Sequence, residues 1–230
     1  MPPWWLVVLS WCALGVGFGC AGWILADIYG RGYRQLMPVM EAVWPITALY
    51  FGPVALWAYH RFGRPSTRRW RTEHKRAQPP DKPGWASVAV AVSHCGAGCT
   101  LGDIIAEFVV FALALTIAGQ ALFCEYLGDY LLAVTLGIVF QYFAIAPMRG
   151  LSLRKGLIEA AKADIISLTA FEIGLFGWMA LMSYVFFPGP HLHPDSPVYW
   201  LFMQIGMIIG FGTAYPANVW LIRHGIKEAM

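Results

Sequence analysis

The amino-acid sequence predicts an all-α integral membrane protein, built as a bundle of about six transmembrane helices. Hydrophobic residues make up 58% of the chain and charged residues only 13%, whereas ordinary globular domains contain about 25% charged residues. The hydrophobic residues form stretches of roughly 20 residues, the length that an α-helix needs to cross a bilayer. The 11 tryptophans and 24 glycines are typical of the aromatic belts and close helix packing found in lipid.

Six stretches of the chain have the length and composition of membrane spans. The first lacks the charged start and cleavage site of a signal peptide, so we expect it to be retained. The third is expected to be interrupted near Gly96–Gly98, where the glycines would permit an unwound turn. In chain order the expected spans are 4–26, 38–59, 98–119 (with an entering piece at 85–95), 130–146, 164–187 and 198–222.

The chain is expected to divide into three regions. Residues 1–59 would hold two N-terminal transmembrane helices, residues 60–84 a basic, proline-rich cytoplasmic linker, and residues 85–230 a four-helix membrane core that carries the polar motifs. Fourteen of the sixteen lysines and arginines fall on one side of this six-span arrangement. By the positive-inside rule that side is cytoplasmic. We therefore expect a multi-pass protein of the bacterial inner (plasma) membrane, with both termini and the 60–84 loop in the cytoplasm.

The most informative stretch is 93–107, where thiols, an imidazole and carboxyl groups interrupt an apolar segment. Residues four apart lie one turn above each other on a helix. Cys95, Cys99, Asp103 and Glu107 therefore form one polar stripe that leads into the membrane. Ionisable groups inside a bilayer are costly, and by default they mark a functional site.

Other predicted spans bring polar side chains to the same membrane layer. At a helix rise of about 1.5 Å per residue, Glu107 and Glu172 are both expected roughly 12 Å from the inner boundary. Asp103 is expected about one turn shallower. The sequence therefore predicts a polar intramembrane cluster of six residues: Asp103, Glu107, Asp164, Glu172, Tyr215 and Asn218.

The three residues that would receive a metal ion are His94, Cys95 and Cys99. Thiolate, imidazole and carboxylate ligands together suit Cu(I) or Zn(II). Adjacent helical residues diverge by about 100°, so His94 and Cys95 would face one ion only if the helix unwound. Our leading hypothesis is a small inner-membrane protein that binds or transports a transition metal ion, with copper as the favoured ion. The carboxyl groups would neutralise the charge of the ion or couple its movement to protons. Asn218 and Tyr215 would orient these groups.

Other interpretations of these residues stay open. The cysteines could be packing residues, and the acids could be protonated groups that bond across helices. Cys95 and Cys99 could instead serve a membrane redox protein or enzyme, or the polar stripe could bind a partner helix in a structural or assembly subunit. Weaker candidate metal ligands are the thioethers Met203 and Met207, and an outer group of His191, His193 and Asp195.

The expected cofactors and partners follow from these residues. A copper or zinc ion is the only cofactor expected, because the chain has no nucleotide, flavin or haem motif. Candidate partners are the lipid bilayer, a metal ion or the metallochaperone that delivers it, and a second copy of the chain. Nucleic acid is not expected, because the basic residues flank membrane spans.

Three motifs resemble a bacterial family of small polytopic membrane proteins that carries only a domain-of-unknown-function label. They are Ser93–Cys99 followed by Gly102–Glu107, Ala170–Met179, and Tyr215–Asn218 with Trp220–Arg223. The resemblance covers about residues 85–230. It implies membership of a family and no mechanism.

Overall fold

The protein is all-α, as predicted. The computed structural model describes residues 2–149, 152–189 and 192–227, and it contains no strand within these ranges. A π-helical turn extends α1 to Gly30 and another extends α7 to Phe186. The helices are α1 (Trp4–Leu25), α2 (Met40–Phe51), α3 (Pro53–Ala58), α4 (Arg68–Glu73), α5 (Gly84–Ala112), α6 (Ala121–Arg149), α7 (Leu153–Leu181) and α8 (Pro197–Arg223).

Five helices within the described ranges are long and apolar enough to cross a membrane, namely α1, α5, α6, α7 and α8. The second predicted span, 38–59, is not one of them. It folds as α2 and α3, which meet at Gly52 with φ +51° and ψ −122°. This backbone conformation favours glycine, and Pro53 then supplies a favourable first residue for the next helix.

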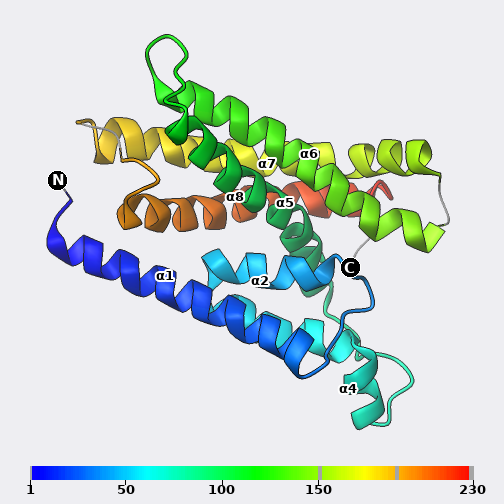
Figure 1. Cartoon of the computed structure of the whole chain (residues 1–230). Coiled ribbons are helices and arrows are strands. Elements are labelled where there is room, and N and C mark those ends of the chain that lie inside the picture. Colours follow the sequence, from blue (N-terminus) through cyan, green and yellow to red (C-terminus); the bar gives the residue numbers. More distant parts are fainter. Residues whose placement is uncertain (1, 150–151, 190–191, 228–230) are drawn as a thin grey trace.

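Helices α2 and α3 form a hairpin that reaches about half-way along α1 (Figure 1). At its open end, the Tyr59 hydroxyl donates a hydrogen bond to Asp27 at the end of α1, over 2.9 Å. At its closed end, Gln204 in the first half of α8 donates to the Leu49 carbonyl over 2.6 Å. A Cβ atom on Gly17, near the middle of α1, would lie 2.6 Å from that same carbonyl oxygen. The closed end therefore packs against the interior of the bundle.

Helix α5 is continuous from Gly84 to Ala112, so the predicted interruption near Gly96–Gly98 is wrong. Small residues on this helix instead allow close contact with α6. A Cβ atom on Gly98 would lie 2.7 Å from the Cα of Gly137, and one on Gly102 would lie 2.6 Å from the backbone nitrogen of Ala133. Small residues are favoured where two membrane helices pack backbone to backbone.

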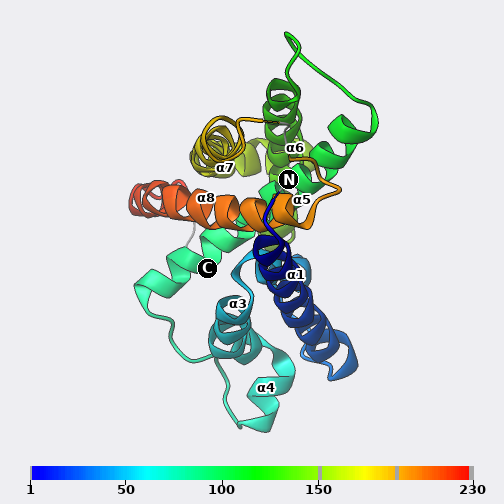
Figure 2. The ribbon, with the colours of Figure 1, turned by 90° about the vertical axis from the view of Figure 1, so that its left-hand side faces the viewer.

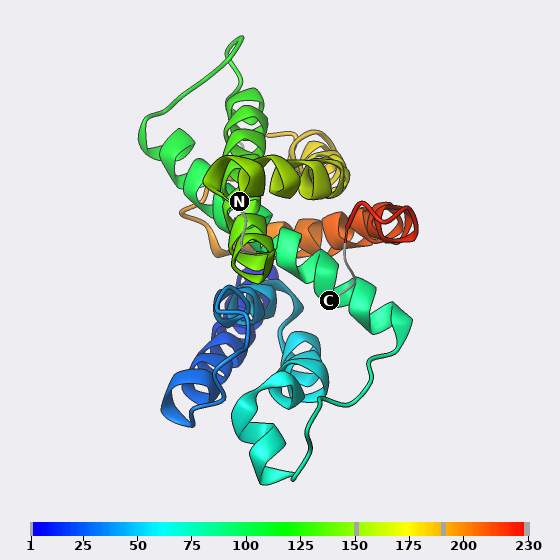
Figure 3. The same ribbon diagram turned by 90° about the vertical axis from the view of Figure 1, so that its right-hand side faces the viewer.

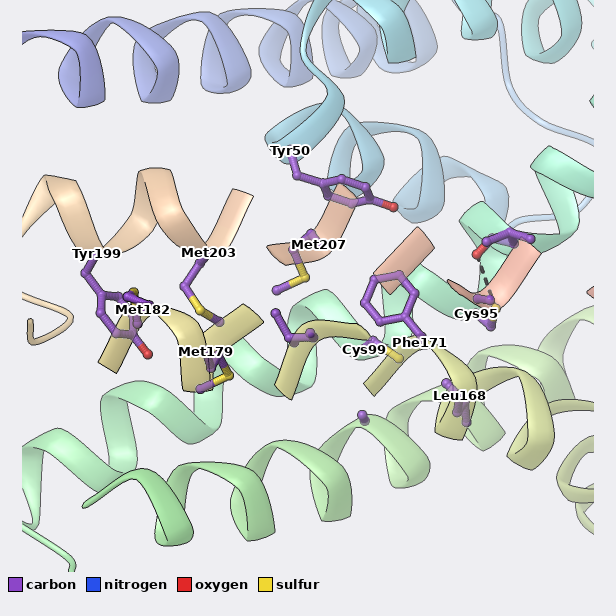
Figure 4. Packing of buried hydrophobic residues seen from close by; sticks show 14 of the residues in the cluster. Tyr50, Cys95, Cys99, Leu168, Phe171, Met179, Met182, Tyr199, Met203 and Met207 are labelled. Carbon is purple, nitrogen blue, oxygen red and sulfur yellow. Dashed lines mark hydrogen bonds between the residues drawn. The ribbon is translucent and has the colours of Figure 1, made fainter. Parts of the chain in front are cut away.

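End-on views show α5 and α8 in the middle of the molecule (Figures 2 and 3). Helices α1 to α4 lie on one side of them, and α6 and α7 on the other. Helices α1 and α8 run in the same direction, so Trp4 and Arg223 lie at opposite ends of the bundle (Figure 1). A buried apolar cluster fills the space between α5, α7 and α8 (Figure 4).

Candidate functional site

Four carboxylic acids meet inside the bundle, and we call them the acidic cluster: Asp103 and Glu107 of α5, Asp129 of α6 and Glu172 of α7. Each side chain is at most 1% exposed. Asp103 lies near both Glu107 and Glu172, and Glu107 lies next to Asp129. None of their eight carboxyl oxygens has a hydrogen-bond partner among the described residues. The cluster is therefore buried, acidic and unsatisfied by the described part of the protein.

The geometry of the helices explains why these acids converge. Asp103 and Glu107 are four residues apart, so they share one face of α5. The Cβ position of Gly128 lies 3.2 Å from the Cβ of Ala106, and this close approach brings the neighbouring Asp129 against α5. Helix α7 is held beside α6 by the Tyr126 hydroxyl, which donates a hydrogen bond to the Phe176 carbonyl over 2.8 Å.

A second polar group lies toward the start of α5 and the end of α8, and each of its members bonds another member. We call it the paired cluster: Cys95, Asp164, Ser167, Asn218 and Lys227. Lys227 forms an ion pair with Asp164 over 2.7 Å, and both side chains are fully buried. The Ser167 oxygen lies 2.9 Å from the Cys95 sulfur, and Asn218 donates a hydrogen bond to Ser167 over 2.6 Å.

The charge on Lys227 is maintained by its partner. Burial disfavours the charged form of this lysine, yet the Asp164 carboxylate raises the pKa of Lys227 above its ordinary value. An ion pair can persist in a low-dielectric interior when its geometry is good and further hydrogen bonds support it. The two charges are held by this one contact, since the second Asp164 oxygen has no hydrogen-bond partner among the described residues.

Sulfur atoms of cysteine and methionine lie in the buried cluster between α5, α7 and α8 (Figure 4). Cys99, one helical turn from Cys95, lies next to Glu172 of the acidic cluster. The Thr100 hydroxyl of α5 donates to the Met207 sulfur of α8 over 3.5 Å. The buried thioethers in this region come from α7, from the π-helical turn that extends it, and from α8: Met179, Met182, Met203 and Met207.

The structure divides the predicted polar cluster into parts. Asp103, Glu107 and Glu172 do come together, in the acidic cluster. Asp164 and Asn218 belong to the paired cluster. Tyr215 joins neither cluster, because its hydroxyl donates to the Trp85 carbonyl at the start of α5. The expected single layer is therefore two separate groups.

The predicted metal ligands do not converge on one point. His94 is buried against Phe140, with ring centroids 6.4 Å apart, whereas Cys95 bonds Ser167 and Cys99 lies beside Glu172. Consecutive residues on an unbroken helix point in different directions. Within the described ranges, no three His, Cys, Asp or Glu side chains are arranged to hold a metal ion. Of the outer group, His193 and Asp195 are exposed and His191 lies outside the described residues.

Two acids of the site were not anticipated from the sequence, Asp129 and its half-buried neighbour Glu125. Both fall between the expected spans 98–119 and 130–146, but α6 begins already at Ala121. Their four-residue spacing repeats the spacing of Asp103 and Glu107. That repeat is the signal from which a second acidic helix face could have been predicted.

The family assignment agrees with this location of the site. No curated protein and no solved structure gives a significant match to the chain. Residues 84–227 match a family described as a domain of unknown function, DUF4396. The matched range begins at the first residue of α5 and ends at Lys227, so it contains both polar clusters and leaves α1 to α4 outside. The chain belongs to the DUF4396 family.

Proposed function

We propose that this protein is a membrane transporter that moves a transition metal ion in exchange for protons carried by the acidic cluster. Copper is the favoured ion. The observation that carries the proposal is that four fully buried acids from three helices have no hydrogen-bond partner among the described residues. Leaving a buried polar group unsatisfied costs about 1–3 kcal/mol. Acids inside a membrane protein commonly mark ion or proton pathways.

Exchange for protons keeps the buried charge constant. When protonated, the four acids are neutral and compatible with a low-dielectric interior. A cation that arrives among them is stabilised by a carboxylate, so a proton must leave for each positive charge that enters. The mutual proximity of Asp103, Glu107 and Asp129 supports passage of a proton from one to the next.

The sulfur atoms favour copper as the cargo. Thiol and thioether ligands select Cu(I) over harder cations, and zinc is the next candidate because thiolate and carboxylate ligands also bind it. Cys99 lies beside the acid Glu172, and the buried Met203 and Met207 lie one turn apart on the facing helix α8. We propose that the ion is passed between successive small groups of ligands, with Cys99 the first thiol that it meets beside the acids.

We also propose an orientation in the bacterial inner membrane. Five spans and a hairpin that enters and leaves on the same side would place all sixteen lysines and arginines in the cytoplasm. The support comes from the parallel directions of α1 and α8, and from the ion pair between Arg64 and Asp27, which holds the return of the hairpin against the end of α1 over 3.3 Å. In this arrangement the N-terminus is outside and the C-terminus inside.

A transport assay tests the proposed function. The purified protein is reconstituted into liposomes that contain a pH-sensitive dye, and Cu(I), Ag(I) or Zn(II) is added outside. We expect internal metal and internal pH to change together, and we expect Glu107→Gln to abolish both changes. Asp81→Asn, at an exposed acid of the linker, is the matched control and should behave as the parent does. Metal uptake without proton movement, or neither, would contradict the proposal.

The orientation is tested separately. Single cysteines are placed at Pro3 and at Gln78 in a variant that lacks the five native cysteines. An impermeant maleimide added to intact cells should label the cysteine at position 3 and leave that at position 78 unlabelled until the membrane is opened. Labelling of both positions from the same side would refute five spans.

A further inference from the structure

Tyr50 is the residue by which the N-terminal hairpin reaches the core of the family domain. It lies at the closed end of α2, two residues before Gly52, and is 6% exposed. A Cβ atom on Gly96 of α5 would lie 3.2 Å from the Tyr50 hydroxyl oxygen. Tyr50 belongs to the same buried cluster as Cys95 and Cys99, the residues on either side of this part of α5. The hydroxyl has no hydrogen-bond partner among the described residues.

Contacts from several helices fix the Tyr50 ring. It packs on Phe51 with ring centroids 4.9 Å apart, and Phe51 in turn packs edge-on against Phe211 of α8 at 5.0 Å. The preceding residue, Leu49, is held by Gln204. Figure 4 shows the ring reaching from α2 toward the sulfur-containing cluster between α5, α7 and α8.

A cavity of about 330 Å³ lies on the other side of this ring. Helices α1, α5 and α8 form its walls, and one end is lined by the 194–197 loop, which includes the first residue of α8, Pro197. Tyr50, Thr100 and Met207 line the opposite end. Because α5 and α8 run antiparallel here, the cavity leads from the 194–197 loop to the middle of the bundle. Tyr50 therefore borders both the cavity and the buried cluster that contains the two thiols.

We propose that Tyr50 is a gate that separates this cavity from Cys95 and Cys99, and that the hairpin thereby controls how an ion reaches the family domain from the side of the 194–197 loop. The identity of what passes rests on the proposed transport function. The proposed barrier itself does not, because it is argued from one aromatic ring that borders both a cavity and the cluster of two buried thiols.

Thiol reactivity tests the gate directly. The three other cysteines (Cys12, Cys20 and Cys124) are replaced by serine, so that only Cys95 and Cys99 react. The full chain in lipid nanodiscs is treated with N-ethylmaleimide, and the rate of addition is followed by mass spectrometry. Tyr50→Ala should raise this rate about tenfold or more, because removing the ring joins the thiols to the cavity. Tyr50→Phe keeps the ring and should react at the parental rate.

Two further variants make the result decisive. Phe18→Ala enlarges the same cavity at its lipid-facing wall, where Phe18 is 64% exposed, and should leave the rate unchanged. Tyr50→Leu replaces the ring by a smaller apolar side chain with less loss of packing than alanine, so it gives the answer if the alanine variant does not fold. Equal rates in the parent and in every folded Tyr50 variant would overturn the gate.

The outcome of this assay is independent of transport. Faster labelling of Tyr50→Ala in a protein that moves no metal would support the gate and refute the proposed function. Metal transport by the parent, with labelling that Tyr50→Ala leaves unchanged, would support the function and refute the gate.

Discussion

The two polar clusters differ in how their members are satisfied, although both are fully buried in the same family domain. In the paired cluster every member has at least one bonded partner: Lys227 neutralises Asp164, and Ser167 joins Cys95 to Asn218, although one oxygen each of Asp164 and Asn218 is unpartnered among the described residues. In the acidic cluster, Asp103 and Glu107 have neighbours of the same charge type and no hydrogen bond to any described residue. Polar groups that bond one another stabilise a fold, whereas a cluster with no internal bonds is costly. The paired cluster is therefore expected to serve stability, and the acidic cluster to serve function.

The largest expected effect is on stability, from Lys227→Ala. This change leaves the Asp164 carboxylate buried without its cation, and breaking a buried pair in this way costs about 3–5 kcal/mol. The free energy of unfolding in mixed detergent micelles measures the loss.

A double variant separates the charge from the packing. Replacing both partners, in Asp164→Leu with Lys227→Met, removes the pair without leaving a single charge, so most of the stability should return. If the single and double variants were equally unstable, the contribution of Lys227 would lie in its packing and not in its charge.

The next effect is on transport, from Asp103→Asn combined with Glu107→Gln. The amides keep the size of the acids but cannot release a proton, so transport should fall at least 100-fold, about 2.7 kcal/mol. The free energy of unfolding should change by less than about 1 kcal/mol, because no bond among the described residues is lost.

Both quantities are measured on the same preparation. A variant that keeps its transport rate would remove these two acids from the mechanism. A variant that loses its fold together with its transport would show that the acids are structural, as the paired cluster is.

A smaller effect is expected where α5 and α6 are held together, at Gly102. A methyl group there would meet the backbone of Ala133 at 2.6 Å. Gly102→Ala should therefore cost about 1–3 kcal/mol and move Asp129 away from its neighbours on α5. Gly177→Ala on α7 is the matched control, since nothing lies within 4 Å of its Cβ position, and it should stabilise the helix by up to about 1 kcal/mol. Equal effects of the two substitutions would show that the α5–α6 contact is not tight.

The sequence predicts the acids on α5 and α7 because composition and four-residue spacing report a polar stripe on an apolar helix. It does not predict that 38–59 turns back, because 22 mostly apolar residues have the length of a span. Only the Gly52–Pro53 pair signals the turn. Likewise, Gly96 and Gly98 are compatible with a kink or with close packing, and the location of α6 decides between them.

Division of the polar residues into two clusters depends on tertiary structure. Cys95 and Cys99 lie on the same helix one turn apart, but different residues of α7 face them, Ser167 in one case and Glu172 in the other. The register between two helices is set by side-chain packing along their whole length. Spacing within one helix therefore identifies candidate residues but not their partners.

The smallest expected effect comes from Ser167→Ala, at the centre of the paired cluster. Both neighbours of Ser167 keep another partner, because Asn218 also donates to the Ala214 carbonyl and Cys95 to the Val92 carbonyl. The loss should therefore be about 1 kcal/mol of unfolding free energy, with transport and metal content unchanged. If transport fell while stability stayed the same, Cys95 and its neighbours would belong to the ion route. The two clusters would then act as one continuous pathway through Cys99, and bonding within a cluster would no longer separate structural from functional residues in this bundle.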